Sequence, residues 1–274
     1  MPSTYAHYKL GHDVQNRLIG AQRVIVDSQN DLYMIGLHGP DILFYHRPLV
    51  SDPVNAVGYS SHEKSGRSFF EQARDAVIVS ENQAAALAYA YGVLCHFALD
   101  ASCHAYVDEK INASGIPHTE IEVEFDRMLM LDDDLDPVTC DLAAHIVPSC
   151  INASIIAPFY PGVSARSVHS SLKSMKRYNK LLIARTPLKR HLIFALMRLT
   201  GNYREMHGLI VNPQGNPLCD DSNKELKRLY NTAVKRAVSF MTDFDEFLAE
   251  RADLPEFFNL AFSGRVPEKA EVDE

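Results

Sequence analysis

The chain has 274 residues, 46% of them hydrophobic and 23% charged, and a chain of this size buries a substantial core. Its formal net charge of −8 argues against a protein that coats nucleic acids, since nothing overall attracts it to a polyanion. No apolar run approaches the length needed to cross a bilayer, so we expect no transmembrane segment.

The cysteines and the N-terminus both indicate a reducing compartment. Five cysteines are scattered along the chain and none forms a C-x-x-C pair, so we expect reduced thiols. Residues 1–7 have neither the basic nor the apolar region of a signal peptide. We therefore expect a cytoplasmic protein.

The first half of the chain is predicted to be mostly helical. Apolar residues recur at helical spacing over residues 7–26, with two interrupting glycines, and over residues 67–79. Residues 32–57 contain three prolines, which predicts irregular backbone. Ser80–Gln83 has the form of a capping box that opens a long helix over residues 84–107. Pro117 favours the start of another helix, over residues 117–131.

The second half continues the helical pattern. After a short, proline-punctuated region at 137–162, helices are predicted over residues 163–185, 187–200 and 222–251. Strict apolar–polar alternation is nearly absent, so we expect no sheet. The sequence therefore predicts an all-α protein with a single domain over residues 1–265 and a disordered tail at 266–274.

Five metal-type ligands lie within 27 residues of the central helices. They are His96, Asp100, His104, His118 and Glu122. Residues four apart share a helix face, so the first three form one stripe and the last two form a pair on the next helix. Imidazoles and carboxylates that converge from two helices suit zinc. One such pair would usually be an ordinary polar face, but three pairs this close favour a metal site.

Three further candidates precede this region. Asp41 lies at a turn in Gly39-Pro40-Asp41, His62 comes just before the 67–79 helix, and His7 is near the N-terminus. Each alone is an ordinary polar residue. Cys95 and Cys103 are each rotated by about 100° from a neighbouring ligand candidate, so we expect them in the core.

The chain resembles the zinc-dependent phospholipase C family, which is related in fold to the S1/P1 nucleases. The resemblance is carried, in order, by residues 4–8 (TYAHY), 36–42 (GLHGPDI), 58–63 (GYSSHE), 92–104 (GVLCHFALDASCH) and 118–122 (HTEIE). It covers roughly the first half, to about Leu131. It implies a helical bundle that holds three zinc ions in a cleft and hydrolyses phosphodiesters or phosphomonoesters.

The resemblance also implies a role for each ligand. Asp41, His62, His96 and Asp100 would hold one zinc, and His104, His118 and Glu122 a second with an open position. His7 and a bridging Asp100 would hold a third, together with the N-terminal amine and carbonyl.

The chain departs from the family at this third site, because secreted members commonly supply a tryptophan there and this chain has none. We therefore expect two to three ions. Alternates near this site are His12, His38 and His46.

In such a site Asp41 is the candidate catalytic residue, since its carboxylate would orient the attacking water or take its proton. Glu63, Ser102 and Glu120 are available to fix the imidazoles. The predicted reaction is phospholipase C-like cleavage of a phospholipid headgroup or a small phosphodiester. The alternatives are an S1/P1-like nuclease or phosphomonoesterase, and an inactive zinc-stabilised binding module.

The second half carries no recognised motif, but it is locally basic. Its basic stretch comprises Lys173, Lys176, Arg177, Lys180, Arg185, Lys189, Arg190 and Arg198. A solvated helix face is one interpretation, and a patch for an anionic substrate or transient contact with a membrane surface is the other. Phe69, Phe70 and Tyr106 would line an acyl or choline pocket or belong to the core. His145, His169, His191 and His207 are expected to be structural or exposed.

Overall fold

The computed structural model describes residues 4–201 and 203–267, and over these residues it contains helices and no strand. One isolated bridge pairs Ser65 with Ala261. The predicted all-α class is confirmed.

Between residue 4 and Asp132, the structure has seven α-helices and one 3-10 helix. They are α1 (Thr4–Gln15), α2 (Gly20–Ser28), α3 (Asn30–Gly36), η1 (Gly39–Tyr45), α4 (Pro53–Glu63), α5 (Gly66–Val79), α6 (Gln83–Ser114) and α7 (His118–Asp132).

One sequence prediction for this half is confirmed and one was wrong. Residues 7–26 are helical with an interruption at a glycine, as predicted: they form two helices, and the second begins at Gly20, which has a φ of 60°. Residues 32–57 are largely helical rather than irregular. Pro40 and Pro53 lie in the first turns of η1 and α4, where the missing proline N–H leaves no bond unmade.

The long helix α6 begins with a different cap from the one predicted. Asn82 is its N-cap and accepts a hydrogen bond from the backbone N–H of Ala85 at 3.1 Å, whereas Ser80 ends α5. The helix continues to Ser114, beyond the predicted residue 107, and stops at Gly115, which has a φ of 70°. Pro117 directly precedes α7, as predicted.

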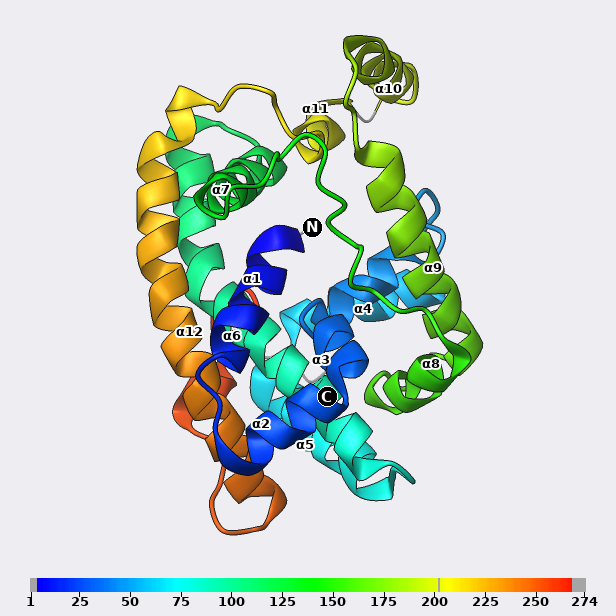
Figure 1. Cartoon of the computed structure of the whole chain (residues 1–274), viewed down its shortest axis with the longest axis vertical. Helices are drawn as coiled ribbons and strands as arrows, with labels where there is room; N and C mark the ends of the chain where they lie inside the picture. Colours follow the sequence, from blue (N-terminus) through cyan, green and yellow to red (C-terminus); the bar gives the residue numbers. More distant parts are fainter. Residues whose placement is uncertain (1–3, 202, 268–274) are drawn as a thin grey trace, which may run out of the picture.

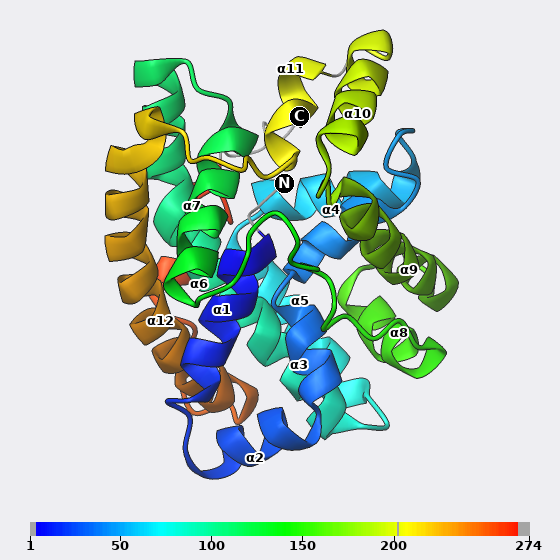
Figure 2. The same cartoon turned by 45° about the horizontal axis from the view of Figure 1, so that its top comes forward.

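The C-terminal half adds α8 (Cys150–Ile156), η2 (Ala157–Phe159), α9 (Ala165–Leu182), α10 (Pro187–Leu199), α11 (Tyr203–Met206), η3 (His207–Leu209), η4 (Pro217–Cys219), α12 (Asp220–Leu248) and η5 (Glu256–Asn259). Figures 1 and 2 show α12 running beside α6, and α10 standing at the edge of the molecule beside α11. The three helices predicted for this half are confirmed, with α12 starting two residues before and ending three residues before its predicted bounds.

Helix α6 is the central element of the fold and packs most extensively on α12 and α3. Its length and apolar composition would suffice to cross a membrane, contrary to the prediction that no run is long enough. However, 89% of its most apolar window is buried by the other helices, as in the core helix of a globular fold.

Helices α3 and α6 touch through two glycines. A Cβ at Gly36 would collide with the carbonyl oxygen of Tyr89, and one at Gly92 with that of Tyr33. Their absence lets the two backbones approach closely. This crossing fixes the end of α3 and the start of η1 against the turn of α6 that carries His96.

One large hydrophobic core includes residues from α1 to η5, and a small second cluster joins α10 and α11 to the end of α9. The single-domain assignment stays a prediction. The predicted tail, residues 266–274, lies largely outside the described residues; Val266 and Pro267 are described and are not helical.

Candidate metal centre

Three of the predicted ligands form the expected stripe on α6. His96 and Asp100 are almost fully buried, and His104 is partly buried one turn later. The Asp100 carboxylate is central: its Oδ2 lies 3.2 Å from His96 Nε2 and 3.8 Å from His104 Nδ1. A buried carboxylate between imidazoles is costly unless charge or metal compensates it.

Helix α7 supplies the second pair. His118 Nε2 lies 2.8 Å from Glu122 Oε1, and His104 Nε2 lies 3.4 Å from the same oxygen. Glu122 is buried, whereas His118 is partly exposed. The three side chains therefore meet between α6 and α7.

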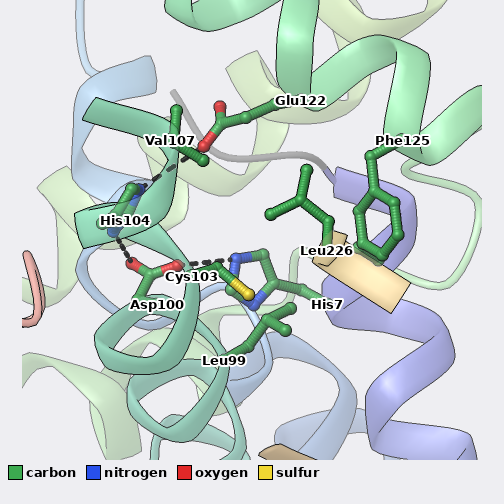
Figure 3. A pocket seen from close by; sticks show the side chains of 10 residues that line it. His7, Leu99, Asp100, Cys103, His104, Val107, Glu122, Phe125 and Leu226 are labelled. Carbon is green, nitrogen blue, oxygen red and sulfur yellow. Dashed lines mark ion pairs between the residues drawn. The ribbon is translucent and has the colours of Figure 1, made fainter. Parts of the chain in front are cut away.

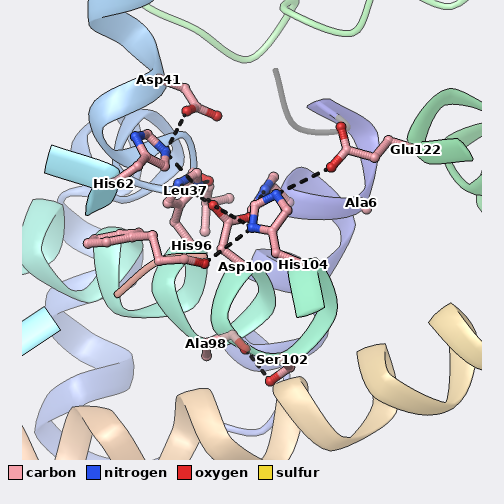
Figure 4. Close-up of polar contacts among 12 residues, drawn as sticks. Ala6, Leu37, Asp41, His62, His96, Ala98, Asp100, Ser102, His104 and Glu122 are labelled. Carbon is pink, nitrogen blue, oxygen red and sulfur yellow. Dashed lines mark hydrogen bonds and ion pairs between the residues drawn. The ribbon is translucent and has the colours of Figure 1, made fainter. Parts of the chain in front are cut away.

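The three early candidates reach the same place from separate elements. His7 on α1 places Nε2 3.1 Å from Asp100 Oδ1, and His62 on α4 places Nε2 3.0 Å from Asp41 Oδ1 and 3.9 Å from Asp100 Oδ2. Figure 4 shows Asp41 and His62 on one side of Asp100 and Glu122 on the other. All eight predicted ligands are thus brought together.

Helix α1 is held in position by its first turn. The backbone N–H groups of Tyr5 and Ala6 donate to the two Asp126 oxygens at 3.0 and 2.7 Å. A carboxylate at a helix N-terminus satisfies donors that have no partner within the helix and complements the helix dipole. These bonds fix His7, the next residue along α1, relative to α7.

The eight residues fall into three groups whose ligand atoms lie within 4.8 Å of one another. The groups are His7, His96 and Asp100; Asp41, His62 and His96; and His104, His118 and Glu122. Two ligands of one tetrahedral zinc, each about 2.0–2.2 Å from the ion, are about 3.3–3.6 Å apart. The shortest nitrogen–oxygen separations here, from 2.8 to 3.4 Å, are close to that value.

Unpaired buried atoms provide a test of fit that does not depend on spacing. Among the described residues, eight buried side-chain atoms lack a hydrogen bond, and five of them belong to these groups. They are His7 Nδ1, Asp41 Oδ1, His96 Nε2, Asp100 Oδ2 and Glu122 Oε2. Leaving such atoms unmatched is unfavourable, and a cation bound to them would satisfy them. The donor set, imidazole nitrogen with carboxylate oxygen, fits zinc.

Backbone carbonyls orient the imidazoles. The Nδ1 atoms of His62, His96 and His104 lie 2.8, 3.2 and 3.2 Å from the carbonyl oxygens of Gly58, Leu37 and Phe262. In a neutral imidazole, an Nδ1–H that donates to a carbonyl leaves Nε2 free as a ligand.

The three side chains proposed for this orienting role do not fill it. Ser102 Oγ donates to the Ala98 carbonyl, and Glu120 accepts from Asn216 Nδ2. No hydrogen bond from Glu63 to these imidazoles is recorded among the described residues.

Charges within the groups shift the ionisation of their members. Burial opposes ionisation of Asp100, but the adjacent His96 and His104 outweigh it and hold its pKa well below the usual range. Burial likewise opposes ionisation of Glu122, yet His118 and His104 lower its pKa to about 2. The two carboxylates in turn overcome burial at His104 and raise its pKa to about 10. Both carboxylates are therefore anionic at neutral pH and available to a cation.

Gly39 lets the backbone of η1 pass directly against the His96 ring. Its φ is 46°, and a Cβ there would lie 2.6 Å from His96 Cδ2. Only glycine combines this backbone conformation with this contact. The turn that carries Asp41 is thus pressed directly onto an imidazole of the site.

Other histidines and cysteines remain outside the three groups. His38 Nε2 lies 2.7 Å from His145 Nε2, His46 Nδ1 lies 2.7 Å from Asp52 Oδ2, and His12 packs on the ring of Tyr8. The alternates named for the third site are thus not recruited among the described residues. Cys95 is buried in the core, where burial raises its thiol pKa to about 12.

An open cleft of about 250 Å³ exposes members of two groups. It is lined by Asp41, His62, His104 and His118, together with Phe44, Tyr59, Asp108 and Ser263. Phe44 and Tyr59 stack with ring centroids 4.4 Å apart, and Tyr59 is 58% exposed. A second, much smaller cavity of about 30 Å³ lies against His7, Asp100, Cys103 and Glu122 (Figure 3).

Phe44 and Tyr59 were missed by the sequence reasoning. Tyr59 lies three residues before His62 on α4, so the helical spacing that identifies neighbours could have found it. Phe69 and Phe70 belong to the buried core, and Tyr106 does not line the cleft. Of the two interpretations left open for them, the core one therefore applies to Phe69 and Phe70.

Comparison with known proteins gives one result. The family described as zinc-dependent phospholipase C matches residues 6–174, which is more than half of the chain. The match extends past Leu131, where the resemblance was expected to end, through α8 and into α9. No curated protein and no solved structure matches the chain.

Proposed function

Since the chain belongs to the zinc-dependent phospholipase C family, we propose that it is a zinc-dependent phosphoric ester hydrolase that cleaves a phospholipid headgroup or a related small phosphodiester. One observation carries the proposal: ligand candidates from two separate groups line the same open cleft. A phosphoryl group in that cleft would lie against both.

The proposed metal ligands are His7, Asp41, His62, His96, Asp100, His104, His118 and Glu122, which would hold two to three ions. Zinc bound there would lower the pKa of a bound water and neutralise charge on the phosphoryl oxygens. Asp100 would serve more than one ion, since it belongs to the group of His7 and its Oδ2 also lies 3.9 Å from His62 and 3.8 Å from His104, which belong to the other two groups.

Asp41 has the proposed catalytic role. It lines the cleft beside His62, so its carboxylate is within reach of a water that would attack the phosphorus. It would orient this water and accept its proton. His104 and His118 line the same cleft and would hold the ion next to the bound substrate.

The first test is the metal content of protein purified without chelator or affinity metal, by elemental mass spectrometry. Two to three zinc ions per chain are expected. His104→Ala should lose zinc and hydrolysis while circular dichroism remains helical, and His169→Ala, outside the three groups, should lose neither. Full activity of His104→Ala would contradict the ligand assignment.

Two variants separate the roles of Asp41. Asp41→Asn keeps an oxygen ligand but removes the base, so it should retain most zinc and lose hydrolysis. Asp41→Ala should lose zinc as well. Equal zinc loss in both variants would mean that Asp41 acts as a metal ligand and would give no support to its role as the base.

The stacked Phe44–Tyr59 pair favours a second candidate, an S1/P1-like nuclease, because bases stack on exposed aromatic rings. Hydrolysis of phosphatidylcholine, bis-p-nitrophenyl phosphate and single-stranded DNA should be compared. Cleavage of DNA alone, weakened by Tyr59→Ala, would favour the nuclease. Zinc without hydrolysis of any of the three would favour an inactive zinc-stabilised module.

The proposal includes a cytoplasmic location. All five cysteines are free, which is compatible with a reducing compartment. Fractionation of the source cells would test it.

A further inference from the structure

Basic and acidic residues are unevenly distributed along the chain. Residues 142–204 contain ten Lys or Arg and no Asp or Glu, which leaves 17 of the 27 basic residues and all 35 acidic ones elsewhere. A segment of 63 residues without one acid is unusual in a chain of net charge −8. This basic segment includes α8, α9 and α10.

On α9 the charge forms a ridge along one side of the helix. Arg166, Lys173, Arg177 and Lys180 recur at helical spacing and are all exposed. Lys173 and Arg177 make no recorded ion pair or hydrogen bond within the described residues. Lys180 Nζ lies 3.8 Å from Asp141 Oδ2, so among the described residues it is the one member of this cationic ridge with an acidic partner.

Helix α10 continues from the ridge and is apolar on its outer face. Leu188, Leu192, Leu196 and Leu199 are between 61 and 86% exposed, one turn apart. The opposite face is also apolar: Ile193, Phe194 and Met197 belong to the small second cluster. Contiguous exposed leucines of this kind mark an interaction surface.

The position of α10 is fixed rather than loose. Arg190 donates to the backbone oxygen of Val211 at 2.7 Å and to the side chain of Asn212, and Lys189 Nζ donates to the Ile183 carbonyl at 2.6 Å. Figures 1 and 2 both show α10 projecting at the rim of the molecule. The leucine face is thus exposed on a helix that is held in place by hydrogen bonds to the rest of the protein.

A hollow lies between the end of the charged ridge and the start of α10. It has a volume of about 370 Å³ and is lined by Lys180, Arg185, Thr186 and Lys189, with Ile183 and Asp141. Three cations against one acid suit an anionic headgroup.

We propose that the cationic ridge of α9 and the leucine face of α10 form a docking surface for an anionic lipid bilayer. Exposed leucines flanked by Lys and Arg are the composition of helices that lie in a membrane interface. The charge of this segment is opposite to that of an anionic leaflet, whereas the rest of the chain would be repelled by it.

The surface is also connected to the metal centre. Helix α10 contacts α11, α11 contacts η3, and η3 packs on α7, which carries His118 and Glu122. Docking through α10 would bring that side of the molecule to the lipid. This consequence rests on the proposed function, but the docking itself does not.

The test is cosedimentation with vesicles of phosphatidylcholine, with and without phosphatidylglycerol. The Asp41→Asn protein is measured beside the unmodified chain, so that headgroup hydrolysis does not alter the vesicles. Binding to the anionic vesicles is expected, together with its loss as salt rises from about 0.1 to about 1 M, where the Debye length falls to about 3 Å.

Two double variants address the two parts of the surface. Leu192→Glu with Leu196→Glu should weaken binding about tenfold or more, because both side chains would leave the interface. Lys173→Glu with Arg177→Glu should weaken it roughly fivefold or more for each cation. All four positions are exposed, so the fold should persist.

Matched controls lie away from the surface. Val24→Glu on α2 replaces another exposed apolar residue, and Lys224→Glu with Lys235→Glu on α12 reverses two exposed cations. These variants should bind as the unmodified chain does. Equal binding by the ridge and face variants, or no binding to anionic vesicles, would overturn the proposal.

A second copy of this chain is the other partner that could cover the leucine face. Sedimentation velocity without lipid should give the same sedimentation coefficient for the unmodified chain and for the variant with Leu192→Glu and Leu196→Glu. A dimer that these changes dissociate would overturn the lipid assignment in favour of a second copy of the chain.

A soluble short-chain phosphatidylcholine separates this proposal from the proposed function. Its hydrolysis should be equal in the surface variants and the unmodified chain. Hydrolysis without vesicle binding would overturn the docking surface alone, and vesicle binding without any hydrolysis would leave docking intact and remove the hydrolase.

Discussion

The metal centre and the α9–α10 surface depart from ordinary protein chemistry in opposite directions. The metal centre buries carboxylates and imidazoles and leaves five buried atoms without hydrogen bonds. The α9–α10 surface exposes leucines, and cations of which Lys173 and Arg177 have no acidic partner in the described part of the chain. Buried polar atoms without partners and exposed apolar stripes are both unfavourable in isolation, so each indicates something absent from the isolated chain.

The two regions also differ in how they are held. The ligand residues come from five elements and are fixed by close contacts, such as that of Gly39 with His96. The outer face of α10 is mostly exposed, and the helix is held by its inner face and by hydrogen bonds of Lys189 and Arg190. A metal site needs fixed geometry, whereas a surface for a fluid bilayer needs only the right composition.

The largest expected effect is at Asp100, which faces two ligand groups at once. Asp100→Ala should lower hydrolysis about 10²–10⁴-fold, the equivalent of several kcal/mol of transition-state stabilisation. Elemental mass spectrometry should show less zinc than in Glu109→Ala, an exposed control on the same helix. Unchanged zinc would remove Asp100 from the ligand set.

Two leucine truncations compare buried and exposed apolar residues directly. Leu172→Ala, fully buried on α9, should cost about 2–5 kcal/mol of unfolding free energy. Leu192→Ala on α10, 63% exposed, should change it by less than about 0.5 kcal/mol. Urea titration measures both. A large loss at Leu192 would mean that its side chain is covered in solution.

Two glycine substitutions separate backbone strain from contact with the metal centre. Gly39→Ala and Gly20→Ala both force a left-handed conformation, at about 1–2 kcal/mol each. Only at Gly39 does the new Cβ meet His96, so only Gly39→Ala should also reduce bound zinc. Thermal unfolding and metal content distinguish the two, and equal zinc in both variants would contradict the contact.

The smallest effect concerns acid stability. Burial, with the neighbouring His145, His7 and His96, holds the pKa of His38 well below its usual range. Burial also lowers the pKa of His145, to about 3. The unfolded chain therefore binds protons that the folded chain excludes, so stability falls as pH drops below about 6.5, and at His145 the loss continues towards pH 3. At pH 6 the loss is less than about 1 kcal/mol for each histidine.

His145→Gln tests this assignment. The drop in unfolding free energy between pH 7.5 and pH 6 should be smaller than in the unmodified chain, while His191→Gln on the exposed face of α10 should follow the unmodified chain. Urea titrations at the two pH values measure the difference. An identical drop in all three proteins would show that His145 does not contribute.

The ligand spacing and the helical class were determined by the sequence itself. The i, i+4 stripe of His96, Asp100 and His104 depends only on helix geometry, and the absence of alternation excluded a sheet. The sequence also contains Pro40 and Pro53, but whether a proline starts or interrupts a helix depends on the segment before it. That ambiguity made the 32–57 prediction wrong.

Only the tertiary structure brought His7, Asp41 and His62 onto that stripe, because each lies on a different element and no local spacing links them to α6. The same holds for the carbonyls that orient the imidazoles and for the Phe44–Tyr59 stack beside the cleft. It holds also for the leucines of α10, whose pattern suits a buried face as well as an exposed one. Local periodicity fixes which residues share a side of a helix, and packing alone decides what that side meets.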